Sequence, residues 1–283
     1  MKFYYQLLFL LLVTFLLIGC NKENPSEPTS SPYDNASFSK GGIMYDKFWA
    51  TESGFDQTNA NLATFKAHSD FFRCKACHGW DLLGNTGSYI GRGAKTTRPA
   101  VAGLNLYQIA KSKTAQELFD AMKKSTGRRD VSYDLTQYDP TSNNTTGNQM
   151  PNFSQILTDA QIWDIVKFLK EGAFDVSQLY DATYTGTYPT GSAKYSNIGK
   201  DGNGTNGKSY FTQKCSSCHG ADGRTITLEG MTAGKFIRSK PNEVQHKVKY
   251  GQLGSAMPGD FNMSLSQMKD LYKAVTDTLT FPN

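Results

Sequence analysis

One five-residue pattern occurs twice in this 283-residue chain and constrains its fold more than any other feature. The sequences CKACH at 74–78 and CSSCH at 215–219 both have the form C-x-x-C-H. Together they contain four of the five cysteines, and the fifth is Cys20. Two close pairs and one single cysteine are not the layout of a small disulfide-rich domain. The wide separation of the two copies suggests that each belongs to its own packing unit.

The pattern has a chemical reason. Two thiols three positions apart on a helical turn can reach the two vinyl groups on one edge of a haem, and the next residue can bind the iron. The predicted covalent attachment residues are Cys74, Cys77, Cys215 and Cys218, and the predicted iron ligands are His78 and His219. This predicts two haem c groups.

Three other interpretations of the motif are less favoured. Zinc sites would need four good ligands each, and only His68 and His246 remain as spare imidazoles. A thioredoxin-like redox pair would not need a histidine after the second cysteine in both copies. Chance repetition of a pattern built from such rare residues is improbable, so haem attachment is the favoured interpretation.

Both halves resemble class I cytochrome c domains, and the resemblance covers most of residues 41–283. Gly79 and Gly220 directly follow the two histidines, as in that family, and we expect that a side chain there would crowd the backbone against the haem. Residues 41–46 and 72–81 also look like one group of exported bacterial cytochromes. The resemblance implies an all-α fold with two tandem domains, each a few helices around a covalently attached haem.

Two methionines are predicted to be the sixth iron ligands, because methionine sulfur is common in cytochromes c. Met150 and Met257 each precede a proline, follow a helical segment and a loop, and lead into a capped helix. The predicted pairs are His78 with Met150 and His219 with Met257. Met122 is interpreted as a core residue on an apolar stripe. His68 and His246 are less favoured alternatives, and His246, between Gln245 and Lys247, is expected on a solvated helix face.

Helix signals repeat in the two halves. Capping boxes are predicted at Thr114, Thr158 and Ser264, where Glu or Gln lies three positions later. Another helix is predicted to open at Ser239 and Pro241 and to close at Gly251. The same order of elements in both halves predicts an internal duplication. By resemblance to the family, a carbonyl in residues 99–103 should accept a hydrogen bond from the second ring nitrogen of His78.

The N-terminus predicts export and anchoring. Lys2 precedes a twelve-residue apolar run over residues 7–18, which is short for a spanning helix of about 20 residues. Residues 17–20, Leu-Ile-Gly-Cys, resemble the lipobox of bacterial lipoproteins, which implies cleavage before Cys20 and its lipidation; an uncleaved anchor is the alternative. Asn21 after the cysteine implies the outer membrane, on its periplasmic face or at the cell surface.

The predicted organisation is a signal peptide at 1–19, a lipidated cysteine and flexible tether at 20–40, a first cytochrome c domain at 41–175, a linker at 176–199 and a second domain at 200–283. Residues 21–40 are rich in Pro, Ser, Asn and Glu, which predicts disorder. The formal net charge of +5 is mild and no Lys/Arg cluster accompanies it, which argues against nucleic-acid binding.

The favoured function is electron transfer between redox proteins at the cell envelope through two His/Met-ligated haems, without a catalytic residue. The alternative is a di-haem peroxidase-like or other haem oxidoreductase, which would need an iron with an openable sixth site. A gas sensor would need the same opening. Di-haem thiosulfate dehydrogenases, which resemble the layout, use an extra cysteine ligand, and here Cys20 is assigned to the anchor. The oligomeric state is left open.

Overall fold

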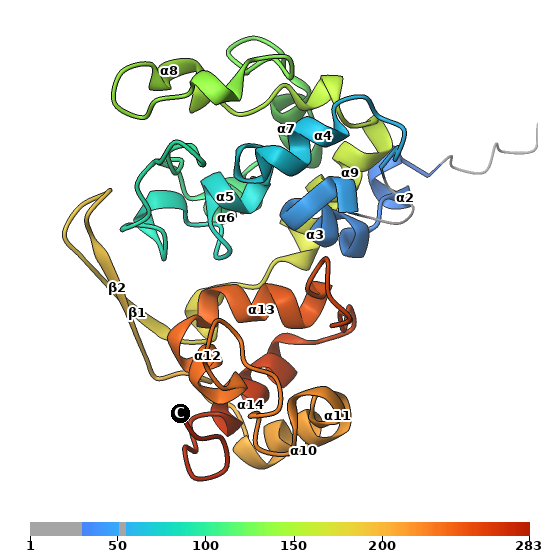
Figure 1. Ribbon diagram of the computed structural model, residues 1–283. Helices are drawn as coiled ribbons and strands as arrows, with labels where there is room; N and C mark the ends of the chain where they lie inside the picture. The colour runs from blue at the N-terminus through green and yellow to red at the C-terminus, as the bar shows by residue number, and fades with distance from the viewer. Residues whose placement is uncertain (1–29, 51–54) are drawn as a thin grey trace, which may run out of the picture.

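The computed structural model describes residues 30–50 and 55–283, which form a mostly helical chain with one β-hairpin (Figure 1). The expected signal peptide, Cys20 and residues 21–29 of the expected tether lie outside the described residues. None of the helices in the described ranges is both long and apolar enough to cross a membrane.

The first half of the chain forms a group of short helices, drawn in blue to yellow-green in Figure 1. Its α-helices are α2 (Pro32–Asn35), α3 (Phe38–Lys47), α4 (Leu62–Ala67), α5 (Cys74–His78), α6 (Leu106–Ser112), α7 (Ala115–Lys123), α8 (Asn144–Gly147) and α9 (Asp159–Lys167). Its other helical turns are η2 (Phe48–Ala50), η3 (Ser69–Phe71), η4 (Gly84–Thr86), η5 (Leu135–Gln137), η6 (Phe153–Gln155) and the π-helical η7 (Phe168–Gly172).

The second half begins with η8 (Val176–Gln178) and the antiparallel hairpin of β1 (Asp181–Thr185) and β2 (Ser192–Ser196). Its α-helices are α10 (Gly204–Lys214), α11 (Ser216–His219), α12 (Ala233–Ser239), α13 (Pro241–Tyr250) and α14 (Leu265–Ala274). Each half has its own cluster of buried apolar side chains.

The predicted capping boxes are confirmed. The side chains of Thr114, Thr158 and Ser264 each accept a hydrogen bond from the amide three residues later, and the side-chain oxygen of the Glu or Gln at that position accepts one from the amide of the cap residue. The predicted start at Ser239 is wrong: Ser239 ends α12, Lys240 is the N-cap of α13, and Pro241 is its first residue. Proline suits this position because its missing N–H would have no helical partner there.

In each half the first and last long helices touch at a glycine. A Cβ on Gly41 of α3 would lie 1.9 Å from the backbone oxygen of Asp164 in α9. A Cβ on Gly207 of α10 would lie 1.9 Å from the backbone oxygen of Asp270 in α14. Only glycine allows the two backbones to approach this closely. The contact recurs at corresponding places in the two halves, as the predicted internal duplication would require.

The end of the expected tether is structured. Ser31 forms a capping box with Asp34 at the start of α2, and the Tyr33 hydroxyl donates to Glu171 Oε1 at 2.6 Å. The Ser37 amide donates to Asp164 Oδ1 at 2.6 Å. Residues 31–40 are polar in composition, but these hydrogen bonds to the first half fix them. The expectation of a flexible segment up to residue 40 is therefore wrong for these residues.

Residues 176–199, expected as a linker, form the hairpin that runs alongside both halves (Figure 1). At its tip, the Tyr188 hydroxyl accepts a hydrogen bond from the Val101 amide of the first half at 3.0 Å. On β2, the Tyr195 hydroxyl donates to Asn242 Oδ1 on α13 at 3.1 Å. The hairpin thus connects the two halves through side-chain bonds as well as through the chain itself.

Helix α13 lies where the two halves meet (Figure 1). The Gln245 side-chain amide donates to the Trp80 carbonyl at 2.8 Å, and the Tyr250 hydroxyl donates to the Gly172 carbonyl at 2.7 Å. Between them, His246 is only 2% exposed. The expectation of a solvated His246 is therefore wrong, because the face of α13 that carries it packs on the first half.

Candidate haem-binding sites

The first C-x-x-C-H motif forms the single turn α5, which ends at a glycine with positive φ. Gly79 has φ +77°, a conformation that side-chain-bearing residues rarely adopt, and its Cβ would lie 2.5 Å from Asp81 Oδ1. Gly220 after α11 has φ +78° and would meet Thr225 Oγ1 at 2.4 Å. Both glycines are therefore required by the way the chain leaves the helix, a reason that the sequence alone did not supply.

The predicted residues of the first site line one apolar cavity of about 490 Å³. Cys74, Cys77 and His78 contribute one part of the wall, and Met150 contributes another. The remaining lining is mainly aliphatic and aromatic and comes from α6, α7, α9 and the loop at 100–104. A cavity of this size and character suits a large, flat, mostly apolar ligand.

Burial determines the protonation of the first motif. It raises the pKa of the Cys74 thiol to about 12 and that of Cys77 to about 11. Redox-active C-x-x-C pairs have a lowered thiol pKa instead, so the thioredoxin-like alternative loses its chemical basis. Burial, with a smaller effect of Arg128, lowers the pKa of His78 to about 4. The imidazole is neutral at pH 7, as a metal ligand must be.

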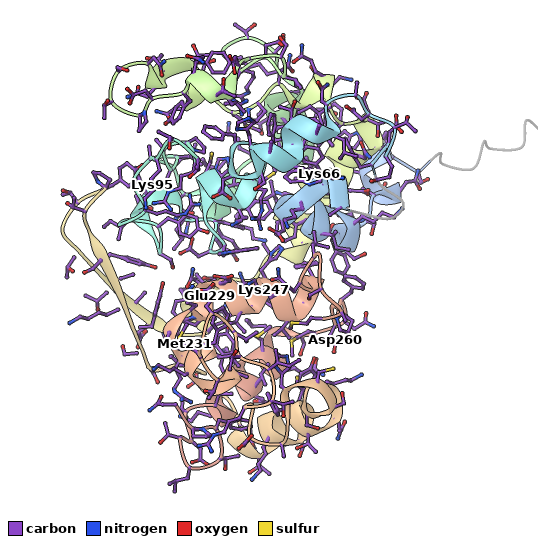
Figure 2. All side chains as sticks on the ribbon, viewed as in Figure 1. Lys66, Lys95, Glu229, Met231, Lys247 and Asp260 are labelled. Carbon is purple, nitrogen blue, oxygen red and sulfur yellow. The ribbon has the colours of Figure 1, made fainter. Side chains whose placement is uncertain are left out.

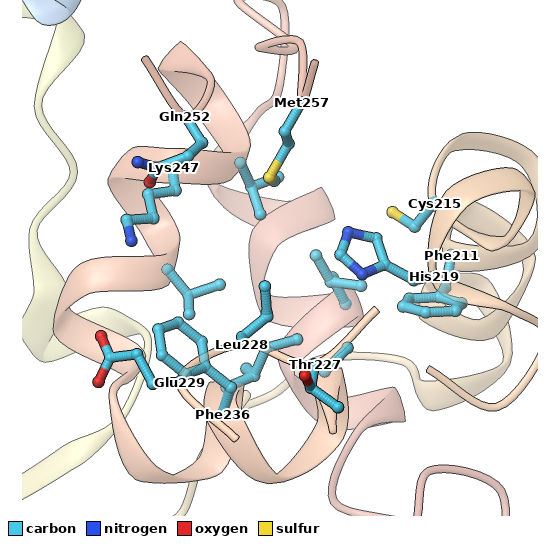
Figure 3. Close-up of a pocket in the computed structure, with 15 residues that line it drawn as sticks. Phe211, Cys215, His219, Thr227, Leu228, Glu229, Phe236, Lys247, Gln252 and Met257 are labelled. Atoms are coloured by element: carbon cyan, nitrogen blue, oxygen red, sulfur yellow. The ribbon is translucent and has the colours of Figure 1, made fainter. Parts of the chain in front are cut away.

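The second site repeats this arrangement in a smaller cavity of about 270 Å³. Cys215, His219 and Met257 line it, whereas Cys218 is exposed and is not one of its lining residues. Figure 3 shows the Met257 sulfur and the His219 imidazole pointing into the cavity from different sides. Burial raises the pKa of Cys215 to about 11 and lowers that of His219.

The less favoured ligands are placed as follows. Met122 is 8% exposed in the first core and also lines the first cavity, so two methionines border that space. His68 caps the end of α4 and does not line either cavity. Within residues 30–50 and 55–283, no three His, Cys, Asp or Glu side chains are grouped to hold a metal ion directly.

Four buried polar atoms of cavity-lining residues have no hydrogen-bond partner among the described residues: Nδ1 of His78, Nδ1 of His219, Nε of Arg128 and Oε1 of Gln252. The loop at 99–103 does border the first cavity, but the Ala102 carbonyl accepts from the Asn85 amide at 3.0 Å and no carbonyl accepts from His78. The expected hydrogen bond is therefore not formed. The fit to a haem rests on the donor set instead: His78 with Met150, and His219 with Met257, offer an imidazole and a thioether in the wall of an apolar cavity, and these residues fit a haem.

Sequence reasoning missed two polar residues of the cavity walls. Arg128 lines the first cavity, and one of its terminal nitrogens donates to the Ala121 carbonyl at 2.7 Å. Lys247, labelled in Figure 2, lines the second cavity from α13 and pairs with Glu243. A cation at the mouth of an apolar cavity can pair with an acidic edge of the ligand. No local pattern distinguishes these cations from ordinary surface residues.

Comparison with known families gives one match in each half. Residues 65–173 match the family described as Cytochrome c. Residues 202–275 match the family described as Cytochrome C oxidase, cbb3-type, subunit III. No curated protein and no solved structure matches the chain. Since both family matches are cytochrome c domains, the chain is a c-type cytochrome, a class of helical haem proteins that transfer electrons.

Proposed function

We propose that the chain is a di-haem electron carrier built from two tandem cytochrome c domains. One haem is held by Cys74, Cys77, His78 and Met150, and the other by Cys215, Cys218, His219 and Met257. The observation that supports this proposal is the repeated cavity, which has C-x-x-C-H residues and a Met-Pro methionine in its wall in both halves. Bound haem supplies an iron that changes by one electron between its ferrous and ferric forms.

The chain's own residues favour electron transfer over catalysis. His78 and Met150 offer two axial ligands for one iron, and His219 and Met257 offer two for the other. The apolar walls limit access of water to both irons. Among the described residues, Glu229 of the second cavity is the only carboxylate in either cavity wall, and it pairs with Lys240.

We further propose that Cys20 is lipidated and tethers the protein to the outer membrane of the cell envelope, where redox proteins are its partners. The lipobox-like residues 17–20 support the anchor. The match to the family described as Cytochrome C oxidase, cbb3-type, subunit III supports redox partners. A Cys20→Ser variant should leave the membrane fraction once it carries a cleavable secretory signal, and continued sedimentation with membranes would contradict the anchor.

The number of haems is tested by intact mass. The soluble protein without residues 1–20, which carries no lipid, should exceed the mass of its polypeptide by two haems. Cys77→Ser and Cys218→Ser should each disrupt covalent attachment at one site, because each removes one of the two thioether sulfurs there. A wild-type mass with a single haem, or with zinc, would contradict the proposal.

The choice between carrier and peroxidase is tested in the half-reduced protein. A carrier should remain low-spin at both irons and should consume peroxide no faster than free haem peptides. Some peroxidases release a sixth ligand only when the partner haem is reduced. A high-spin signal with rapid peroxide consumption in that state would favour the peroxidase instead.

A further inference from the structure

The two methionine segments are held in different ways, and Met150 is clamped to the core. The Met150 carbonyl accepts from the Arg129 amide at 2.9 Å, and the Asn152 amide donates to the Arg129 carbonyl at 2.8 Å. Arg129 is itself 1% exposed, and its guanidinium donates to the Phe71 carbonyl at 2.6 Å. Moving Met150 out of the first cavity would therefore break backbone bonds to a buried residue.

Within the described residues, the backbone hydrogen bonds of Met257 are made to its own loop. Its carbonyl accepts from the Gln252 amide at 3.2 Å, and its amide donates to Ser255 Oγ at 3.2 Å. Residues 254–256 and Pro258 are exposed. The nearest bond from this loop to the helices is that of the Asp260 amide to the Val248 carbonyl, at 2.9 Å. Met257 can thus move without breaking a hydrogen bond to the core.

A cleft of about 580 Å³ reaches Met257 from outside the second cavity. It lies between α3 of the first half and the loop that follows α13, and its walls include Ile43, Tyr250 and Phe261. Met257 and Gln252 line both the cleft and the second cavity. These two side chains are therefore part of the boundary between the cleft and the second site.

Gln252 supplies a polar group at this boundary. Its Oε1 is buried and has no hydrogen-bond partner among the described residues. A buried acceptor of this kind favours a ligand that brings a donor, because an unpaired buried polar atom is unfavourable. The walls are largely apolar, which favours an uncharged ligand, and Lys40, the one charged side chain among their residues, disfavours a cation.

From these observations we propose that the cleft binds a small, neutral nitrogen base with an N–H group, which displaces Met257 from the second metal site while Met150 stays bound in the first. The proposal rests on the His219/Met257 ligation of the proposed function. The exchange breaks the bond between Met257 Sδ and the metal and forms one to a ligand nitrogen. No electron is transferred, and the N–H donates to Gln252 Oε1.

Imidazole is the probe, added to the oxidised holoprotein while the near-infrared band of methionine sulfur on ferric haem is recorded. We expect the band to be lost in two phases. The part due to Met257 should disappear at an imidazole concentration at least about tenfold below that needed for the part due to Met150. A tenfold ratio corresponds to a difference of about 1.4 kcal/mol in the free energy of binding imidazole. Met257→Ala should remove the sensitive phase and leave the resistant one. Met150→Ala, the matched control, should do the reverse.

The outcomes separate two kinds of failure. A wild-type protein without the band would overturn the ligation on which the proposal rests. A band of full strength that is lost in one phase, or a Met257→Ala protein that keeps the sensitive phase, would overturn the proposal and leave the ligation intact.

The role of Gln252 is tested with 1-methylimidazole, which lacks the N–H group. Wild-type protein should bind imidazole several-fold more tightly than 1-methylimidazole in the sensitive phase. In Gln252→Leu this preference should disappear, because the acceptor is gone while the size of the side chain is similar. The methyl group of 1-methylimidazole affects binding to the wild-type protein and to Gln252→Leu alike. If Gln252→Leu kept the wild-type preference for imidazole over 1-methylimidazole, the proposed hydrogen bond would be ruled out.

Discussion

The Tyr45 hydroxyl connects α3 to the turn that follows the first C-x-x-C-H motif. It donates to the Gly79 carbonyl at 2.7 Å, and the tyrosine is 1% exposed. This carbonyl belongs to the residue directly after His78, so the bond fixes the backbone at the predicted iron ligand. Tyr45 also lines the first cavity, so its ring and its hydroxyl contribute to the same site.

Tyr45→Phe should lower the free energy of unfolding by about 1–2 kcal/mol, because it keeps the ring but leaves the buried Gly79 carbonyl with only a long bond, 3.4 Å, from the Leu82 amide. Tyr107→Phe is the matched control, since the Tyr107 hydroxyl makes no hydrogen bond within the described residues. Its effect should stay within about 0.5 kcal/mol. Urea denaturation of both variants measures the difference, and equal effects would contradict a structural role for the Tyr45 hydroxyl.

The chemistry-bearing residues were accessible from sequence to different degrees. The motifs at 74–78 and 215–219 were readable because attachment chemistry demands a fixed local spacing. His246 was misjudged because its neighbours Gln245 and Lys247 are polar. Lys247 lines a cavity and Gln245 bonds to the other half of the chain, so both neighbours have tertiary roles. The periodicity of apolar residues along a helix indicates which face packs inside its own half of the chain. It does not show that another face of the same helix is covered by the other half.

At the scale of elements, the close contact between α10 and α14 gives a sharp test, because α10 carries two glycines in different surroundings. A Cβ on Gly207 would lie 1.9 Å from a backbone oxygen of α14, whereas the nearest atom to a Cβ on Gly204 would be 3.7 Å away. Gly207→Ala should destabilise the protein by about 1–3 kcal/mol or more through overpacking. Gly204→Ala should be neutral or slightly stabilising, since alanine loses less backbone entropy on folding.

Thermal or urea unfolding followed by circular dichroism would compare the two alanine variants. If Gly207→Ala were as stable as Gly204→Ala, the two helices would not pack at backbone contact. The same reasoning applies to Gly41 between α3 and α9, where the corresponding distance is also 1.9 Å.

Helix ends and helix contacts also differ in how far sequence predicts them. The boxes at Thr114, Thr158 and Ser264 were predicted because both partners of each bond lie within four residues. The hairpin at 181–196 was not predicted. Its strands show alternating exposed and half-buried residues rather than an apolar face, and its contacts are made with distant residues such as Val101 and Asn242. Such contacts are set by the whole fold and leave no local pattern.

At the scale of the whole molecule, the interface between the halves is organised around His246. Its ring lies 5.0 Å from Trp80, 5.8 Å from Tyr45 and 4.8 Å from Tyr250, measured between centroids. Its Nε2 has no hydrogen-bond partner among the described residues. Protonation would place a charge among these rings, so the interface requires the neutral imidazole.

Burial lowers the pKa of His246 to about 4. Asp46 and the Gly42 backbone oppose this shift, whereas Arg73 and Lys75 add to it. Because the folded pKa is below the unfolded one, the unfolded chain binds the proton more readily. The stability contributed by neutral His246 is therefore fully present above about pH 6.5 and is lost as the pH falls toward about 4.

Between pH 7 and pH 5 this linkage should lower the free energy of unfolding by about 2 kcal/mol, on the scale of about 1.4 kcal/mol per pKa unit. His246→Phe keeps a ring at the interface and removes the titrating group. Between pH 7 and pH 5 the free energy of unfolding of this variant should therefore fall by about 2 kcal/mol less than that of the wild-type protein. Urea denaturation of both holoproteins at pH 7 and pH 5 measures this difference.

The other histidines do not affect the comparison. His68 is present in both proteins, so its contribution cancels. In the holoprotein His78 and His219 are expected to be held by iron and to contribute little. Parallel pH dependence in the two proteins would mean that His246 is protonated without loss at the interface, and that the two halves are held together by the hairpin and the hydrogen bonds of α13 instead.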